Sequence, residues 1–368
     1  MRRQVWKDHG IPATASPGKG GSPTRSLTTL LHGLSLLYEG TVRYRNRLYD
    51  RKILQPVRLP LPVVCVGNIT TGGTGKTPMI LHLARFYQKQ GNRPAVISRG
   101  YGSRGASRVN IVSDGKAVLL DPDRAGDEPY LMARVLGNVP VVTGAKRVEA
   151  GYEALKRFRP DILLLDDGFQ HRKIGRDLDI LLMDENAPFG NGHLLPRGIL
   201  REPPESLSRA DAIILTGAGE TGGAPAAADP RIPSEKPLFR ARRKAESFIR
   251  GRENNRRPLA DFRGKPLVAF SGIAAPRSFH RMLNEISGNA PACVTFPDHH
   301  RYTREDVDRL RRVAGRVPGA VLVTTEKDGV KLEKFPDFHE EFHRLRIVMT
   351  LDDGNEAFED LILGVLSS

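Results

Sequence analysis

A glycine-rich loop constrains the fold of this chain more than any other feature. The loop consists of Thr70, Thr71, Gly72, Gly73, Thr74, Gly75, Lys76 and Thr77. It directly follows a valine-rich apolar run of strand type, residues 61–68, and directly precedes a segment of helical type, residues 78–90. This order predicts a buried strand, a turn that cradles phosphate and a helix.

The residue types of the loop suit a nucleoside triphosphate. Glycines allow backbone N–H groups to turn inward around phosphates, and the helix that follows directs its positive end at the anion. Lys76 is expected to reach the β- and γ-phosphates, and the Thr77 hydroxyl to ligate Mg²⁺. We therefore predict that all eight residues bind the nucleotide, although Thr70 replaces the first glycine of the strict pattern. The alternative is a glycine-rich turn that contains Gly75, Lys76 and Thr77 by chance.

Two adjacent acids, Asp166 and Asp167, stand at the end of the apolar run 161–168. Open α/β sheets bind ligands in the crevice outside the carboxyl ends of their strands. An acid at this point of a second strand holds Mg²⁺ opposite the loop threonine. The sequence therefore predicts a magnesium site formed by Thr77, Asp166 and Asp167, without deciding which acid contacts the metal. The alternative is a structural role, such as capping of the next turn.

Apolar runs alternate with helical segments along the chain, which predicts an α/β fold: a P-loop NTPase-like, doubly wound, mostly parallel sheet with a second, smaller α/β domain. Residues 219–236 are rich in Gly, Ala and Pro and are the best linker candidate. We expect the P-loop core over residues 53–218 and the smaller domain over residues 237–368. Further strands are expected at 94–102, 110–114, 139–144, 178–184, 211–217, 266–274, 292–300, 320–328 and 346–350, and helices at 277–287, 304–314 and 356–366.

The charge of the chain points to anionic partners. Lysine and arginine number 57 against 42 acids, a net charge of +15, which favours nucleotide phosphates, nucleic acid or an anionic membrane surface. Nucleic acid is disfavoured because only 6% of the residues are aromatic and no nucleic-acid module is recognisable. The two cysteines, Cys65 and Cys293, exclude a disulfide scaffold and a cysteine-cluster zinc module. A P-loop hydrolase or switch stays open as an alternative.

The amino-terminal part of the chain has two expected segments. Residues 1–25 mix Gly, Pro, Ser and Arg without periodicity, which predicts a disordered extension. Apolar residues recur at helical spacing between Leu27 and Tyr49, followed by a basic cluster that ends at Lys52. This pattern over residues 26–52 is typical of an amphipathic helix that lies on an anionic membrane surface. The alternative is an amphipathic helix packed on its own domain. No apolar run approaches the 18 or more residues of a membrane span.

Several motifs occur together and in a characteristic order. Besides the loop itself, they are SRGYGS (98–103), GDEP (126–129), DDGFQHR (166–172), GNGHLLPRGILREP (190–203), FPDHHRY (296–302) and TTEKDGVKL (324–332). In this combination the chain closely resembles the tetraacyldisaccharide 4′-kinases, the lipid A 4′-kinases of Gram-negative bacteria, from about residue 27 to about residue 350. Ile199 departs from this pattern, in which proline is expected.

The resemblance implies a function. The enzyme would transfer the γ-phosphate of ATP, with Mg²⁺, to the 4′-hydroxyl of an acylated glucosamine disaccharide 1-phosphate, tetraacyldisaccharide 1-phosphate, and so form lipid IVA. The reaction would occur at the cytoplasmic face of the bacterial inner membrane, with the enzyme as a peripheral protein. This implication favours membrane contact by residues 26–52.

The resemblance also implies site residues. Asp127 of the GDEP motif, paired with His299, would be the catalytic base, and Lys76 would complete the catalytic set. Because Asp127 and His299 lie on opposite sides of the expected linker, closure of the two domains would assemble the site. The alternatives are a helix cap for Asp127 and a histidine in a structural hydrogen bond for His299. The residues implied to face the substrate are Arg99, Tyr101, Asn191, Arg201 and Glu202. Of these, Arg201 and Glu202 would contact the metal or the nucleotide, and a structural salt bridge is the alternative for Arg99 and Tyr101. Gln170 and His171 are expected near the site without an assigned role.

Overall fold

The computed structural model describes residues 25–100, 107–217, 229–251, 255–352 and 355–367. Nearly all of the expected extension 1–25 lies outside the described residues. The same holds for Tyr101 and for the larger part of the expected linker 219–236.

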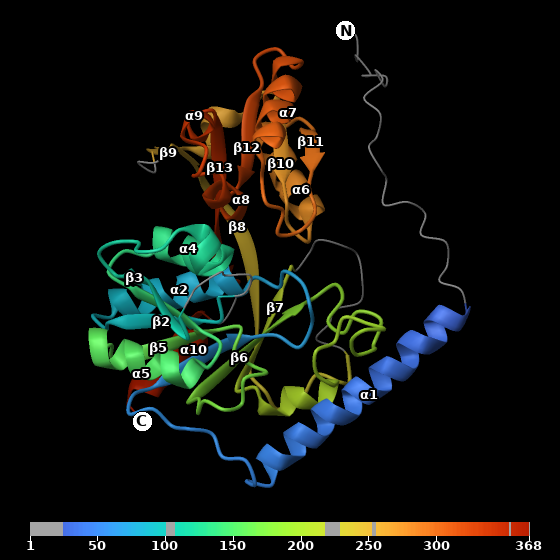
Figure 1. The fold of residues 1–368 in the computed structure, drawn as a ribbon, viewed down its shortest axis with the longest axis vertical. Helices are drawn as coiled ribbons and strands as arrows, with labels where there is room; N and C mark the ends of the chain where they lie inside the picture. Colours follow the sequence, from blue (N-terminus) through green and yellow to red (C-terminus); the bar gives the residue numbers. More distant parts are fainter. Residues whose placement is uncertain (1–24, 101–106, 218–228, 252–254, 353–354, 368) are drawn as a thin grey trace.

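Within these described residues, two lobes share one continuous sheet of 13 strands (Figure 1). The strand order is β11-β10-β12-β13-β8-β7-β6-β1-β5-β2-β4-β3, and β9 pairs with β8. Neighbouring strands are parallel except for the pairs β3–β4, β8–β13 and β8–β9. The mostly parallel α/β architecture expected from the sequence is therefore present.

The first lobe carries the glycine-rich loop after its central strand β1. Its strands are β1 (Val63–Gly67), β2 (Pro94–Ser98), β3 (Val109–Asp114), β4 (Pro140–Gly144), β5 (Ile162–Asp166), β6 (Leu178–Asp184) and β7 (Ala212–Thr216). Its helices are α2 (Lys76–Lys89), α3 (Pro122–Ala125), α4 (Asp127–Val135) and α5 (Arg147–Phe158), with the 3₁₀ helix η1 (Pro204–Arg209). β1, β2, β5 and β7 are buried along their whole length, as continuous apolar runs of a parallel sheet require.

Helices cover both faces of the first-lobe sheet. On one face α2 and α4 pack over side chains such as Val64, Val66 and Leu164. On the other face α5 packs over Cys65 and Leu163. Successive residues of β1 therefore alternate between two separate cores, as strand geometry dictates.

The second lobe repeats the α/β arrangement on a smaller scale. Its elements are β9 (Asn255–Arg257), η3 (Leu259–Phe262), β10 (Leu267–Ser271), α6 (Pro276–Ser287), β11 (Ala292–Thr295), α7 (Arg304–Gly315), β12 (Val321–Thr325), α8 (Glu326–Lys331) and α9 (Pro336–His339). α6 and α7 cover opposite faces of this part of the sheet. The strand expected at 320–328 is shorter, because Thr325 caps a helix that takes up the residues after it.

Two long antiparallel strands, β8 (Leu238–Arg250) and β13 (Phe342–Leu351), join the lobes. β8 begins beside β7 and ends beside β13, and in Figure 1 it runs from the lower lobe into the upper one. We did not expect β8 from the sequence, because basic residues occupy much of the segment LFRARRKAESFIR. Its buried residues nevertheless alternate at the start of the strand, as at Phe239 and Ala241.

The carboxyl-terminal helix α10 (Asn355–Gly364), followed by η4 (Val365–Ser367), returns to the first lobe. Phe358 packs edge-on against Phe239, with ring centroids 5.2 Å apart. The Tyr87 hydroxyl of α2 donates a hydrogen bond of 2.7 Å to the Ile362 carbonyl oxygen. This differs from the expected domain of residues 237–368, since α10 completes the core of the nucleotide-binding lobe.

Helix α1 (Arg25–Asp50) lies along the edge of the first lobe (Figure 1). Its inward side is held by hydrogen bonds from Ser35 to the Leu194 carbonyl oxygen, at 2.8 Å, and from Tyr38 to the Arg201 carbonyl oxygen, at 3.0 Å. Its outward side exposes leucines, among them Leu37, which is 72% exposed. The helix is thus docked on its own lobe and still presents an open apolar face. Among the described residues no helix has the length and apolar character needed to cross a membrane.

Candidate active site

The glycine-rich loop lies between β1 and α2, where two glycines adopt backbone angles that favour glycine. Gly72 has a φ of 124° and Gly75, which precedes α2, a φ of 92°. α2 begins at Lys76, so its free N–H groups face the loop. The loop is also fixed from outside, because the Thr71 N–H donates a 2.7 Å hydrogen bond to the Ile199 carbonyl oxygen. The geometry is that of a phosphate-binding turn.

Lys76 and Arg201 converge on Asp167 beside the loop. Lys76 Nζ lies 3.5 Å from Asp167 Oδ1, and Arg201 Nη1 lies 2.9 Å from Asp167 Oδ2. Burial alone raises the pKa of Asp167, but the two cations outweigh it and the pKa falls below its ordinary value. Arg201 lies close to Asp167 because the backbone of residues 199–201 pairs with the start of the loop. The structure therefore brings together three of the residues expected at the site.

Asp166 has a different environment from its neighbour. Its side chain is buried, and Oδ2 accepts a 2.8 Å hydrogen bond from the Ser98 hydroxyl. Its other oxygen, Oδ1, is buried without a hydrogen-bond partner among the described residues. Burial raises the pKa of Asp166 to about 7, and the nearby charges of Glu128 and Asp167 add to this effect. A buried carboxylate oxygen without a partner beside a phosphate-binding loop fits a divalent cation, for which oxygen ligands are preferred.

Asp127 and His299 meet across the two lobes. His299 Nδ1 lies 3.1 Å from Asp127 Oδ2, although the two residues are 172 positions apart in the chain. Burial raises the pKa of Asp127, yet the hydrogen bond from His299 and the charges of Lys331 and Lys327 outweigh it, so the pKa is lowered. His300 is instead paired within its own lobe, 2.9 Å from Asp306 Oδ2. The expected pair is thus the pair that the fold assembles.

The other predicted substrate residues lie in three different settings. Arg99 is exposed just past the end of β2. Asn191 holds its own loop, because Nδ2 donates to the Arg197 carbonyl oxygen and Oδ1 accepts from the His193 N–H. Tyr101 lies outside the described residues.

The expected contact of Glu202 with substrate or nucleotide needs correction. Its side chain is 0% exposed. The carboxylate accepts hydrogen bonds from Asn46 at 2.7 Å and from both terminal nitrogens of Arg209 at 3.0 and 3.1 Å. A carboxylate enclosed in this way is unavailable to a ligand. Glu202 instead ties α1 to the segment that carries Arg201.

Arg147 is a site residue that the sequence reading missed. It is the first residue of α5 and is 4% exposed. Burial lowers the pKa of its guanidinium, the nearby Arg99 lowers it further, and the carboxylates Asp167 and Asp166 oppose this. The sequence did contain one indication of this role: a positively charged residue follows the strand β4 at the same sheet edge as Asp166 and Asp167.

Gln170 and His171 lie nearby. The Gln170 amide donates a 2.8 Å hydrogen bond to the Asn68 carbonyl oxygen, and burial lowers the pKa of His171 to about 4.

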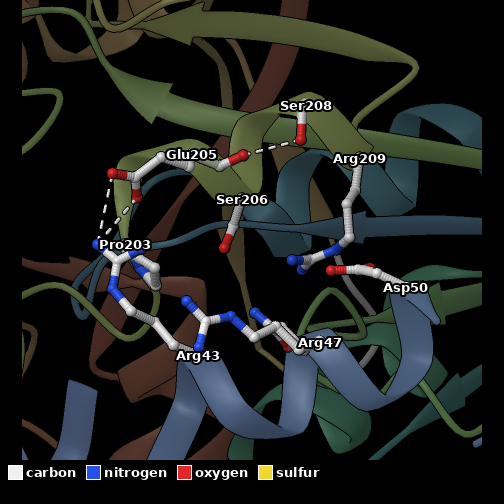
Figure 2. Close-up of a pocket in the computed structure, with 9 residues that line it drawn as sticks. Arg43, Arg47, Asp50, Pro203, Glu205, Ser206, Ser208 and Arg209 are labelled. Carbon is white, nitrogen blue, oxygen red and sulfur yellow. Dashed lines mark hydrogen bonds and ion pairs between the residues drawn. The ribbon is translucent and has the colours of Figure 1, made fainter. Parts of the chain in front are cut away.

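A cavity of about 200 Å³ separates α1 from η1 (Figure 2). Arg43, Arg47 and Arg209 line it together with Asp50 and Glu205. Arg43 reaches across it to Glu205 at 3.3 Å. The cavity therefore belongs to the contact by which α1 docks on the lobe, and we assign it no part in the nucleotide site.

The fold and this site define a P-loop nucleotide-binding protein: a phosphate-cradling turn precedes a helix, and a buried acid ends the neighbouring parallel strand β5. The model of the tetraacyldisaccharide-1-P 4′-kinase family matches residues 27–367. The chain therefore belongs to this family, and the expected family, fold class and kinase activity are confirmed.

Individual relatives agree with this assignment. The chain is 40% identical over 374 residues to a tetraacyldisaccharide 4′-kinase of Syntrophus aciditrophicus, covering 99% of this chain and 97% of the relative. It is 44% identical over 313 residues to that of Geobacter metallireducens, covering 84% and 89%. The crystal structure of LpxK from Aquifex aeolicus in complex with ATP superposes with a TM-score of 0.76 at 32% identity, covering 92% of this chain and 99% of that one.

Proposed function

We propose that this chain transfers the γ-phosphate of ATP to the 4′-hydroxyl of tetraacyldisaccharide 1-phosphate, with residues 70–77 as the nucleotide loop and Asp127 as the base. The observation that carries the proposal is the contact of Asp127 with His299, in a chain of this family that also has a phosphate-binding loop. The crystal structure of the Aquifex aeolicus relative contains ATP, which supports the same nucleotide here.

The residues supply positioning and charge neutralisation, which dominate phosphoryl transfer. Asp127 accepts the proton of the 4′-hydroxyl, whose oxygen forms the new bond to the γ-phosphorus. The bond from that phosphorus to the β,γ-bridging oxygen breaks, and ADP leaves with the electron pair. His299 orients the carboxylate, and Lys76 neutralises charge on the phosphates.

We assign a metal role to Thr77 and Asp166. The partnerless oxygen of Asp166 supports it as the direct ligand, whereas Asp167 is already engaged by Lys76 and Arg201. Mg²⁺, when bound, supplies charge neutralisation at the β- and γ-phosphates. Asp167 then serves to hold the two cations that approach the phosphates.

We further propose that α1 places the enzyme on the anionic cytoplasmic surface of the inner membrane. Leu30 and Leu37 are 59% and 72% exposed on the side that faces away from the lobe. Acyl chains stay in the bilayer while the sugar is phosphorylated, so the enzyme has to meet its acceptor at the interface. The net charge of +15 adds attraction to anionic lipid.

A transfer assay tests the proposal. The protein is incubated with γ-labelled ATP, Mg²⁺ and the disaccharide 1-phosphate lipid in detergent, and the lipids are separated by chromatography. We expect label on the glycolipid with the wild type and at least about a hundredfold less with Asp127→Asn, within the range expected for loss of a general base. Label released only as inorganic phosphate, at a rate independent of lipid, would instead favour a P-loop hydrolase.

A further inference from the structure

A cavity lined almost entirely by polar side chains lies between α1 and η1, at the docking contact described above (Figure 2). Its volume is about 200 Å³. Of the nine residues that line it only Pro203 is apolar: three are arginines, two are acids, two are serines and one is an asparagine. The cavity therefore suits a small polar group that carries charge, and it does not suit an acyl chain.

Several of the charges around the cavity already have partners. Both terminal nitrogens of Arg209 bind the Glu202 carboxylate, at 3.0 and 3.1 Å. Asp50 accepts a 2.8 Å hydrogen bond from Arg172, which does not line the cavity. These groups form the walls of the cavity and are engaged with other side chains of the protein.

Two donors and one acceptor remain for a ligand. The Arg47 guanidinium and the Ser206 hydroxyl have no hydrogen-bond or ion-pair partner among the described residues, and Figure 2 shows both pointing into the cavity. The carboxylate of Glu205 is 68% exposed and accepts hydrogen bonds of 3.3 and 3.4 Å from Arg43. These are longer than charge-assisted hydrogen bonds usually are. The cavity thus offers donors for an anion and, beside them, an acceptor for a cation.

The cavity lies on a strip of α1 that borders its apolar face. Leu36, Arg43 and Arg47 follow one another at spacings of seven and four residues, which places them on the same side of the helix. Leu36 is 55% exposed, and Tyr44, just before Arg47, is 65% exposed. In a helix that rests on a bilayer, tyrosines and arginines beside the apolar face lie at the level of the headgroups. Lipid phosphates are therefore the anions closest to this cavity.

We propose that this cavity binds the headgroup of an ethanolamine phospholipid. Arg47 and Ser206 donate hydrogen bonds to the phosphate oxygens, and the ammonium group of the lipid donates to Glu205. A guanidinium and a phosphate form strong charge-assisted hydrogen bonds, and an ammonium group and a carboxylate do the same. The proposal rests on the membrane contact proposed for α1 and adds a specific lipid to that contact.

The two signs of charge in the cavity favour this headgroup over others. An anionic headgroup would bring negative charge beside Glu205 and Asp50, and like charges in contact are unfavourable. A choline headgroup has the same two charges as ethanolamine, but its nitrogen carries only methyl groups and has no N–H to donate to Glu205. The site should therefore distinguish between these two zwitterionic lipids.

Flotation with neutral vesicles tests the assignment, because vesicles without anionic lipid remove the general attraction to a positively charged protein. The full chain is mixed with vesicles of phosphatidylcholine alone, or of phosphatidylcholine with an equal part of phosphatidylethanolamine. The wild type should bind the ethanolamine vesicles about tenfold more tightly, and Glu205→Gln should reduce this preference to about twofold or less. Because ethanolamine lipid changes bilayer packing equally for both proteins, the difference between them measures the contribution of the cavity.

Arg47→Gln tests the contact with the phosphate. This variant should bind the ethanolamine vesicles about tenfold more weakly than the wild type. Arg51→Gln is the matched control, because Arg51 directly follows α1, is exposed and does not line the cavity. It should bind as the wild type does, and each variant should keep the wild-type circular dichroism spectrum.

The possible failures can be told apart. A wild type without the preference, the same preference in Glu205→Gln, or equal binding by Arg47→Gln and Arg51→Gln would overturn the lipid site and leave the contact of α1 with anionic vesicles intact. Loss of binding in excess inorganic phosphate would assign the cavity to free phosphate instead of a lipid. If Leu30→Asp combined with Leu37→Asp still binds anionic vesicles, the membrane contact of α1 fails, and the lipid site fails with it.

Discussion

Glu202 provides the sharpest test of how α1 is attached to the nucleotide-binding lobe. Its carboxylate is fully buried and bound by Asn46 and Arg209, with Arg45 Nη2 at 3.8 Å. Glu202→Ala removes the acceptor and leaves the Arg209 guanidinium, which is 15% exposed, without this partner. Removing one partner of a buried ion pair destabilises by about 3–5 kcal/mol. We therefore expect a decrease of about 3 kcal/mol in the free energy of unfolding.

Urea denaturation, followed by circular dichroism, measures this change. With a slope of about 3 kcal/mol per molar urea, the midpoint should fall by about 1 M. Glu205→Ala is the matched control, because Glu205 lies three residues further along, is 68% exposed and also pairs with an arginine of α1. An exposed pair contributes about 0–1 kcal/mol, so this control should stay close to the wild type.

The pH dependence gives a second check on the same group. Burial raises the pKa of Glu202, but Arg209 and Asn46 outweigh it, so the folded-state pKa lies below the ordinary value of 4.5. The stabilisation is therefore present above about pH 4.5 and is lost as the pH falls through the folded-state pKa. The stability difference between wild type and Glu202→Gln should shrink between pH 7 and pH 3. A Glu202→Gln variant with unchanged stability and a lower kcat would refute this reasoning and restore a role at the active site.

Three other perturbations test the site and the membrane surface. Lys76→Ala should reduce phosphoryl transfer at least about a hundredfold with an unchanged circular dichroism spectrum, because the phosphates lose their positive partner; transfer at the wild-type rate would contradict the assignment of the loop. Asp166→Asn should raise the Mg²⁺ concentration needed for half-maximal transfer about tenfold or more, as titration of Mg²⁺ at saturating ATP will show. Leu30→Asp combined with Leu37→Asp should release the protein from anionic vesicles in a flotation assay, whereas Leu119→Asp, at another exposed leucine, should not; retention of the double variant would place the membrane contact elsewhere.

The sequence predicted those parts of the site that lie within one short motif, where the residue types indicate the chemistry and the flanking pattern indicates the secondary structure. The loop at residues 70–77 lies between a strand and a helix, and Asp166 ends a continuous apolar strand, so both could be located without the fold. The contact of Asp127 with His299 was predictable only through the family resemblance, because nothing local in either segment indicates a partner 172 residues away.

The remaining differences have physical reasons. β8 went unassigned because its basic residues mask the alternation of Phe239 and Ala241, which continues the sheet into the second lobe. Glu202 was expected at the substrate or nucleotide through the family resemblance. Its burial depends on how α1 packs on the lobe, which the residues around Glu202 do not indicate.

The path of the chain also has a consequence for how the protein is made. The second lobe is inserted between β8 and α10, so the nucleotide-binding half receives its last core helix only when synthesis is nearly finished. A nascent chain that stops before Phe358 leaves Tyr87 and Phe239 uncovered. The nucleotide-binding lobe is thus the first to emerge from the ribosome and the last to be completed. Premature termination before α10 should therefore yield a protein that aggregates, because part of its core is exposed.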